Sequence, residues 1–361
     1  MIFFNSLIVT INNYNNYGNR LQNYALSQLL LKSGTQHTIQ LIEEKESSAS
    51  LLMRSFLRRY RQLFLCRLVK NLDWIRFTHS YYFTKKYISK DSLPFLPKHG
   101  FLKKVSYGRV VIGSDQVWNY LWLSKEDLAL RLGSFVPDDV PVISYAASFG
   151  VSDVSDEVKP IFQKYLPRLK AISVREDRGA ELVREMTGLD ATVVLDPTLM
   201  LTADRWKSIT RGFVPDCDRY VLTYFLGKPS DAQEQAIQEY AQAHGCRVRR
   251  ILDLRDEETY VAGPQDFVEL FQKAQYVFTD SYHACCFSIL FHRQFTVFNR
   301  AGTEGKANMN SRMETLFRLF DLDSVVMDKG MAPQIDYEKV DRLFARHRAE
   351  SRAWLDKAME A

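Results

Sequence analysis

Short apolar runs alternate with stretches of helical periodicity along most of the chain, and each apolar run ends in a polar or glycine-containing loop. This alternation is typical of parallel α/β units, in which buried strands are separated by amphipathic helices. The expected strands are 6–11, 109–112, 142–145, 171–174, 192–195, 220–225, 247–252, 276–279 and 295–298, and the expected helices include 21–31, 230–243, 267–272 and 337–359. The pattern predicts an α/β fold with two Rossmann-like domains that face a central cleft.

The length of 361 residues favours two domains over one or three. We expect an N-terminal domain over residues 1–200, a C-terminal domain over 201–335, and a charged helix over 336–361 that packs back on the first domain. An insertion near 42–100 interrupts the alternation. Between residues 52 and 64 the apolar side chains fall on one helical face and three arginines on the other. That helix either touches anionic lipid at a membrane surface or faces the core with a solvated basic side.

The composition narrows the class of protein without deciding it. A hydrophobic fraction of 46% allows a sizeable core, an aromatic fraction of 13% suits a carbohydrate-handling protein, and a formal charge of +5 fits an anionic substrate or a membrane surface. The five cysteines form no CxxC pair, which favours a reducing compartment. The N-terminus lacks the basic region of a signal peptide, and no apolar run approaches the ~20 residues that span a bilayer. We therefore expect a cytoplasmic protein.

Polar clusters follow several expected strands, at the edge where open α/β sheets bind ligands. In the first cluster, Asn16, Gly18 and Asn19 open a helix, so backbone N–H groups could face a ligand and Gly18 could allow its close approach. The alternative is an ordinary loop with asparagine capping. In the second cluster, Asp115, Gln116 and Asn119 could bind sugar hydroxyls while the Trp118 ring stacks on a sugar face. The alternative is a cap with the indole in the core.

Arg175 and His283 are the two residues with the clearest chemical potential. Arg175 follows a strand and could bind a carboxylate or phosphate through two nitrogens, although a surface pair with Glu176 or Asp177 is the alternative. His283 follows the strand end at Thr279–Ser281, and a helix is expected to begin near Tyr282. The helix start favours anions, and a histidine can exchange a proton near neutral pH. The alternative is a histidine that only bonds neighbouring backbone.

Several motifs are missing. The other histidines show no metal-ligand spacing, and there is no GxGxxG, Walker A, GxSxG or nucleic-acid signature. The DxD pairs Asp216/Asp218 and Asp321/Asp323 lie in expected turns, and we interpret them as structural.

Taken together, the clusters resemble the polysaccharide pyruvyl transferase family. The resemblance rests on six ordered motifs: NYGNRLQNYAL at 16–26, GSDQVWN at 113–119, YAASFG at 145–150, SVRE at 173–176, LDPTL at 195–199 and TDSYH at 279–283. It implies a GT-B-like fold and transfer of pyruvate from phosphoenolpyruvate to a sugar, with a cyclic ketal formed and phosphate released. It implies no metal or organic cofactor. By position, His283 is similar to the family's catalytic histidine and Arg175 to its first-domain arginine.

One departure concerns the donor site. Many members carry arginine two residues before the histidine, where this chain has Ser281. We hypothesise that Arg312 or Lys306 supplies the missing charge, beside Ser281 and Tyr282 at the helix start.

The resemblance implies a hexose acceptor in a bacterial surface-polysaccharide precursor. A lipid-linked acceptor would give the basic helix a reason to contact the inner face of the membrane. Two other classes stay open: a nucleotide-sugar-dependent GT-B glycosyltransferase, and a non-catalytic sugar-binding module. The first is disfavoured because no Asp or Glu occurs from 281 to 303 to hold a donor ribose or sugar.

Overall fold

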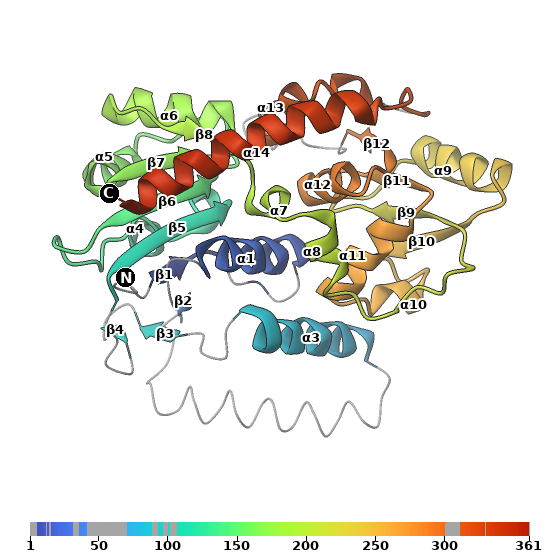
Figure 1. The fold of residues 1–361 in the computed structure, drawn as a ribbon, viewed down its shortest axis with the longest axis horizontal. Helices are drawn as coiled ribbons and strands as arrows, with labels where there is room; N and C mark the ends of the chain where they lie inside the picture. Colours follow the sequence, from blue (N-terminus) through green and yellow to red (C-terminus); the bar gives the residue numbers. More distant parts are fainter. Residues whose placement is uncertain are drawn as a thin grey trace.

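The computed structural model describes residues 6–11, 13, 16–31, 36–41, 71–88, 93–96, 100–101, 107–299, 311–328 and 330–360 (Figure 1). The amphipathic basic segment at 52–64 and Lys306 lie outside the described residues, so both remain predictions. In the part of the chain that is described, no helix combines the length and apolarity needed to cross a membrane.

The first domain is built on an eight-stranded sheet in the order β4-β3-β2-β1-β5-β6-β7-β8. Its neighbouring strands are parallel except β3 and β4. The strands are β1 (Ser6–Val9), β2 (Gln36–Leu41), β3 (Leu93–Leu96), β4 (Gly100–Phe101), β5 (Arg109–Asp115), β6 (Val142–Ala147), β7 (Ala171–Val174) and β8 (Thr192–Val193). The helices are α1 (Tyr17–Leu30), α3 (Leu72–Phe83), α4 (Lys125–Arg131), α5 (Lys159–Tyr165) and α6 (Asp177–Thr187).

The second domain has a five-stranded, fully parallel sheet in the order β10-β9-β11-β12-β13. Its strands are β9 (Tyr220–Tyr224), β10 (Arg247–Ile251), β11 (Tyr276–Thr279), β12 (Gln294–Phe298) and β13 (Val326–Met327). Its helices are α9 (Asp231–Ala243), α10 (Glu257–Tyr260), α11 (Pro264–Lys273), α12 (Tyr282–Leu290) and α13 (Ser311–Phe320). Two short helices, α7 (Pro197–Met200) and α8 (Ala203–Lys207), connect the domains.

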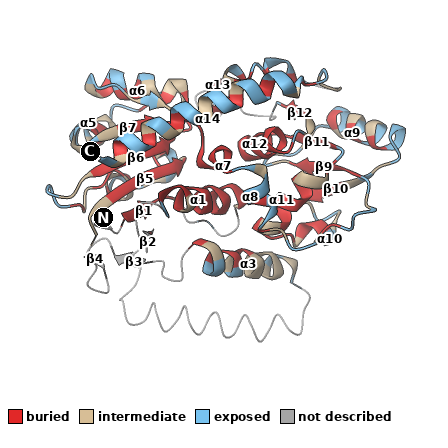
Figure 2. Ribbon diagram, viewed as in Figure 1, coloured by how far each residue is buried: buried red, intermediate tan, exposed pale blue. Residues whose placement is uncertain are grey.

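The last helix, α14 (Tyr337–Glu360), crosses from the second domain over the first (Figure 1). Ser351 Oγ accepts a hydrogen bond of 2.9 Å from the Leu195 N–H, and Arg348 donates to the Leu199 carbonyl. Its outward face is exposed, whereas α1 and α12 in the middle of the molecule are buried nearly throughout (Figure 2). A helix that is apolar on every side is a core helix, and α12 is one.

The pattern-based fold prediction is confirmed: two Rossmann-like domains face a cavity in a GT-B-like arrangement. The largest difference at a helix start is at α1, which begins at Tyr17 rather than at residue 21. The reason is local, because the Asn16 side chain accepts a hydrogen bond from the Asn19 N–H and so caps the helix one turn earlier.

Candidate active site between the two domains

A cavity of about 450 Å³ lies where the two sheets present their carboxyl edges to each other. Eight of the residues singled out from the sequence line it: Asn16, Asn19, Asp115, Gln116, Ser281, Tyr282, His283 and Arg312. Sequence positions almost 300 apart therefore meet at one site. The location fits the rule that open α/β sheets bind ligands beyond the carboxyl ends of their strands.

The start of α12 forms one wall of this cavity. Ser281 is the N-cap residue, but its side chain makes no capping hydrogen bond in the described part of the chain. The nearby Asp280 carboxylate is used elsewhere, because it accepts hydrogen bonds from the Leu226 and Gly227 N–H groups at 2.7 and 2.8 Å. Uncapped N–H groups and the helix dipole attract an anion at such a helix start.

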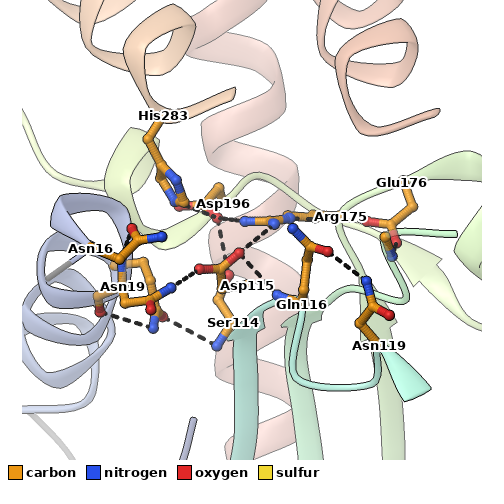
Figure 3. A network of polar contacts seen from close by, with 12 residues as sticks. Asn16, Asn19, Ser114, Asp115, Gln116, Asn119, Arg175, Glu176, Asp196 and His283 are labelled. Atoms are coloured by element: carbon orange, nitrogen blue, oxygen red, sulfur yellow. Dashed lines mark hydrogen bonds and ion pairs between the residues drawn. The ribbon is translucent and has the colours of Figure 1, made fainter. Parts of the chain in front are cut away.

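His283 is held at this helix start with its ring almost completely buried, at 7% exposure. Its Nε2 lies 3.9 Å from Asp196 Oδ2, too far for a hydrogen bond, and has no partner among the described residues (Figure 3). Burial lowers the pKa of His283 below its usual 6.5, although Asp115 and Asp196 partly oppose the shift. The ring is therefore neutral at neutral pH and able to accept a proton.

Gly18 gives the His283 ring its place. A Cβ at position 18 would lie 2.1 Å from Nδ1 and 2.6 Å from Cε1 of His283. The sequence suggested that Gly18 lets a ligand approach the backbone. In the structure the group that lies against Gly18 is the ring of His283, so a residue of the first polar cluster makes room for a residue of the second domain.

We expect Gly18→Ala to displace the His283 ring and to lower kcat by about tenfold or more, because misplacing a reacting group by ~1 Å costs that much or more. Helix α1 itself should tolerate alanine, which is a better helix former than glycine. Steady-state kinetics and thermal melting on the same preparations test this. A Gly18→Ala enzyme with unchanged kcat would show that the ring can occupy another position.

Arg175 is placed differently from what the sequence suggested. Its guanidinium is buried, with Nη1 2.8 Å from Asp196 Oδ2 and Nη2 2.7 Å from Asp115 Oδ1 (Figure 3). Burial alone would lower the pKa of Arg175, but the two carboxylates raise it overall. Neither of the two interpretations from the sequence describes this geometry: Arg175 is not in a surface ion pair, and its guanidinium is not free to bind the carboxylate or phosphate of a ligand. Both terminal nitrogens are occupied, and Arg175 does not line the cavity.

The two carboxylates on Arg175 are themselves tied to the cavity wall. Asp115 also accepts a hydrogen bond from the Asn19 side chain, and burial, which would raise its pKa, is outweighed by Arg175. Asp196 accepts from the Ser114 hydroxyl at 3.0 Å and caps α7 through the Thr198 N–H. Asp196 was not assigned a role from the sequence. The sequence feature that could have pointed to Asp196 is its place directly after an expected strand and before Pro197.

Arg312 is the one Arg or Lys among the described residues that lines the cavity. Its two Nη atoms lie 3.0 and 3.2 Å from the end of the Gln116 side-chain amide, which offers them its oxygen if the amide is turned over. No carboxylate pairs directly with it among the described residues. Burial, assisted by Arg175, lowers the pKa of Arg312 to about 10, so it stays charged at neutral pH. This placement agrees with the hypothesis that Arg312 supplies the positive charge absent at Ser281.

Trp118 and Asn119 need correction as ligand-binding residues. The Trp118 ring is fully buried, contacts Phe149 at 5.2 Å between ring centroids, and donates from Nε1 to the Arg131 carbonyl. Asn119 is also buried and caps the following turn by accepting from the Leu121 N–H. Trp122, one turn further on, lines the cavity with 63% of its surface exposed, whereas the other aromatic residues that line it, such as Tyr282, are buried. Periodicity alone could not tell the buried indole from the exposed one.

The interpretation of the DxD pair Asp216/Asp218 as structural agrees with the contacts of both carboxylates. Asp218 pairs with Arg247 and Arg249, and Asp216 pairs with Lys273, so both carboxylates act within the second domain's own surface. No group of three or more possible metal ligands gathers anywhere in the described part of the chain.

Fold and site together define an α/β protein of two Rossmann-like domains with a helix start, a buried arginine and a histidine in one interdomain cavity. Residues 16–302 match the polysaccharide pyruvyl transferase family. The match covers most of the chain, and the protein belongs to this family. No curated protein matches the chain.

Solved structures with a similar course of the chain have low identity to it. A UDP-GlcNAc 2-epimerase from Neisseria meningitidis bound to UDP-GlcNAc is 10% identical, with coverage of 98% of this chain and 93% of that chain and a TM-score of 0.44. A UDP-N-acetylglucosamine 2-epimerase from Rickettsia bellii is 8% identical, with coverage of 99% and 95% and a TM-score of 0.46. An alpha-glucosyltransferase in complex with UDP is 6% identical, with coverage of 99% and 93% and a TM-score of 0.45.

Proposed function

We propose that this transferase moves pyruvate from phosphoenolpyruvate to two hydroxyls of a hexose, forming a cyclic ketal and releasing phosphate. The observation that carries the proposal is the shared cavity wall of the uncapped α12 start, Arg312 and a neutral His283. Phosphoenolpyruvate bears a carboxylate and a phosphate, and these are the groups that a helix start and a guanidinium bind. In the proposal the donor is a co-substrate, and the chemistry needs no organic cofactor.

The reaction balances with two proton transfers. One sugar hydroxyl adds to C2 of phosphoenolpyruvate and gives up its proton, while C3 gains one proton and becomes a methyl group, so this step has no net gain or loss of protons. The second hydroxyl then attacks C2 and the C2–O bond to phosphate breaks. The proton of this second hydroxyl leaves with the phosphate. Positive charge that develops at C2 and negative charge on the departing phosphate both need preorganised partners.

His283 is suited to the role of base in this sequence. Its neutral ring can accept the proton of the attacking hydroxyl from a position on the cavity wall. Arg175 acts one layer behind, because it fixes Asp115 and Asp196 and leaves Nε2 of His283 without a partner. We therefore propose Arg175 as a positioning residue and Arg312 as the donor-binding cation.

The pH dependence follows from the direction of the His283 shift. Because burial holds the pKa of His283 below 6.5, the ring stays neutral from neutral pH down to about pH 6.5. It becomes protonated, and is lost as a base, only at lower pH. We expect kcat at saturating phosphoenolpyruvate to be flat from neutral pH down to about 6.5 and to fall at lower pH. A kcat that rises as the pH falls would assign His283 to the acid role.

Replacing Arg312 by alanine should weaken donor binding and slow turnover. A charge-assisted hydrogen bond to an anion contributes about 1.5–3 kcal/mol, so the KM for phosphoenolpyruvate should rise about tenfold or more, with kcat reduced as well. The matched control is Arg318→Ala, on the exposed side of the same helix, where the arginine pairs with Asp177. Unchanged donor KM and kcat in Arg312→Ala would reject its assignment.

Acceptor-dependent release of phosphate separates this function from its competitors. The protein is incubated with phosphoenolpyruvate or UDP-sugars and a set of hexose glycosides, and phosphate and UDP are measured. Phosphate release that requires the glycoside supports pyruvyl transfer. UDP release would support a nucleotide-sugar glycosyltransferase, and release of neither would favour a sugar-binding module.

The acceptor in the cell is proposed to be a hexose of a surface-polysaccharide precursor, carried on a lipid. This part of the proposal rests on the family and on the basic pattern at 52–64 in the sequence. A flotation assay with anionic vesicles tests the membrane contact. Protein that stays at the bottom of the gradient would remove the membrane from the proposal.

A further inference from the structure

The two walls of the interdomain cavity differ in chemistry. The second-domain wall carries the α12 start, with Arg312 beside it, and suits an anion. The first-domain wall is rich in uncharged amides, namely Asn13, Asn16, Asn19 and Gln116. Its one carboxylate, Asp115, is already paired with Arg175. A wall of neutral donors and acceptors suits a polyol better than it suits a second anion.

Trp122 lies at this amide wall and is unusually exposed. With 63% of its surface exposed, it is among the most exposed large apolar side chains in the described part of the chain, yet it also lines the cavity. Single exposed apolar residues are common on protein surfaces, but an aromatic ring that lines a cavity beside polar groups is typical of a ligand site. The proposed chemistry gives no role to this ring.

The turn that carries Trp122 is fixed at both ends. Asn119 accepts a hydrogen bond of 3.1 Å from the Leu121 N–H, and the Leu123 N–H closes the turn on the Tyr120 carbonyl. Directly after it, Ser124 caps α4 by accepting from the Asp127 N–H at 3.0 Å. The indole is therefore presented from a rigid backbone, and binding loses little loop entropy there.

We propose that Trp122 is the platform on which a pyranose ring of the acceptor stacks, while the amide wall binds its hydroxyls. An indole face is apolar and electron-rich, and the C–H bonds on one face of a pyranose are apolar and slightly electropositive, so the two surfaces complement each other. The sugar would then lie between Trp122 and His283, on the wall opposite the anion site. This inference deepens the proposed function and rests on it for the identity of the ligand.

Kinetics of Trp122→Ala, Trp122→Phe and Leu121→Ala test the platform. Trp122→Ala should raise the KM for a hexose glycoside about tenfold or more, equal to about 1.4 kcal/mol, and leave the KM for phosphoenolpyruvate unchanged. Trp122→Phe should recover most of the affinity, because it keeps an aromatic face. Leu121 is the matched control, since it is exposed in the same turn but does not line the cavity. An equal effect of Leu121→Ala, or a raised donor KM in Trp122→Ala, would overturn the proposal.

Saturation-transfer NMR separates failure of this inference from failure of the proposed function. Methyl galactoside, methyl mannoside and methyl glucoside are added to the wild-type protein and to Trp122→Ala without phosphoenolpyruvate. Saturation transfer that the substitution abolishes supports the platform even if no pyruvate is ever transferred. Transfer that persists in Trp122→Ala, or none with any of the three glycosides on the wild-type protein, refutes it even if phosphate release is established.

Discussion

His283→Ala should reduce turnover to background while the protein remains folded. General base catalysis contributes about 10²–10⁴ in rate. His283 lines the cavity, and its Nε2 has no hydrogen-bond partner among the described residues, so we expect this atom to accept the hydroxyl proton. The substitution removes a ring that packs on Gly18, so the stability loss should be modest beside the loss of rate. The measurement is kcat for acceptor-dependent phosphate release, with a circular dichroism melt of the same sample.

Two further variants make the result specific. His283→Gln keeps a hydrogen-bonding side chain but cannot exchange a proton, so it should be as inactive as alanine if proton transfer is the role. His244→Ala is the control, because His244 is the C-cap residue of α9 on the exposed surface, where its Nδ1 bonds the Tyr240 carbonyl. Near wild-type activity in either His283 variant would falsify the assignment of the base.

Arg175→Leu should destabilise the protein strongly. It leaves Asp115 and Asp196 buried and facing each other without their cation. Removing one partner of a buried ion pair typically costs about 3–5 kcal/mol, because the remaining charge is uncompensated. Arg312→Leu removes a buried cation that has no direct carboxylate partner among the described residues, so its effect on unfolding should be about 1 kcal/mol or less. Urea unfolding of the two variants gives the comparison.

Neutralising one of the two acids should rescue the first variant. In Arg175→Leu/Asp115→Asn one buried carboxylate fewer lacks its cation, so the double variant should be more stable than the single one. Arg175→Leu should also regain stability as the pH falls, since unpaired buried carboxylates have raised pKa values and protonation relieves them. If Arg175→Leu unfolds like the wild-type protein and only the donor KM rises, Arg175 touches the donor after all.

Local patterns were enough for much of the molecule. The alternation of strands and helices predicted β1 and β5 to β8 of the first sheet and β9 to β12 of the second, but not β2, β3, β4 or β13. The Asp280–Ser281 step predicted that α12 begins at Tyr282. These features depend on neighbours in the chain, such as apolar runs and helix caps, and a sequence displays its neighbours directly. The same reasoning gave the histidine its place at a helix start.

Roles decided by distant partners could not be predicted in the same way. Arg175 follows its strand as expected, but whether its guanidinium meets a ligand or carboxylates depends on residues 60 positions before it and 21 after it. Trp118 and Trp122 lie four positions apart in the sequence, yet one is in the core and the other at the cavity. Burial is set by how layers pack, which local spacing does not encode.

By itself, the sequence determined the α/β architecture, the family motifs and the histidine at a helix start, because each follows from short-range periodicity and capping. Three assignments came from the tertiary structure alone. Gly18 makes room for the His283 ring. Arg175 is neutralised by Asp115 and Asp196, and Arg312 is, among the described residues, the arginine that faces the cavity. Those assignments depend on which charges and rings meet across the two domains, and such meetings arise only when the chain has folded.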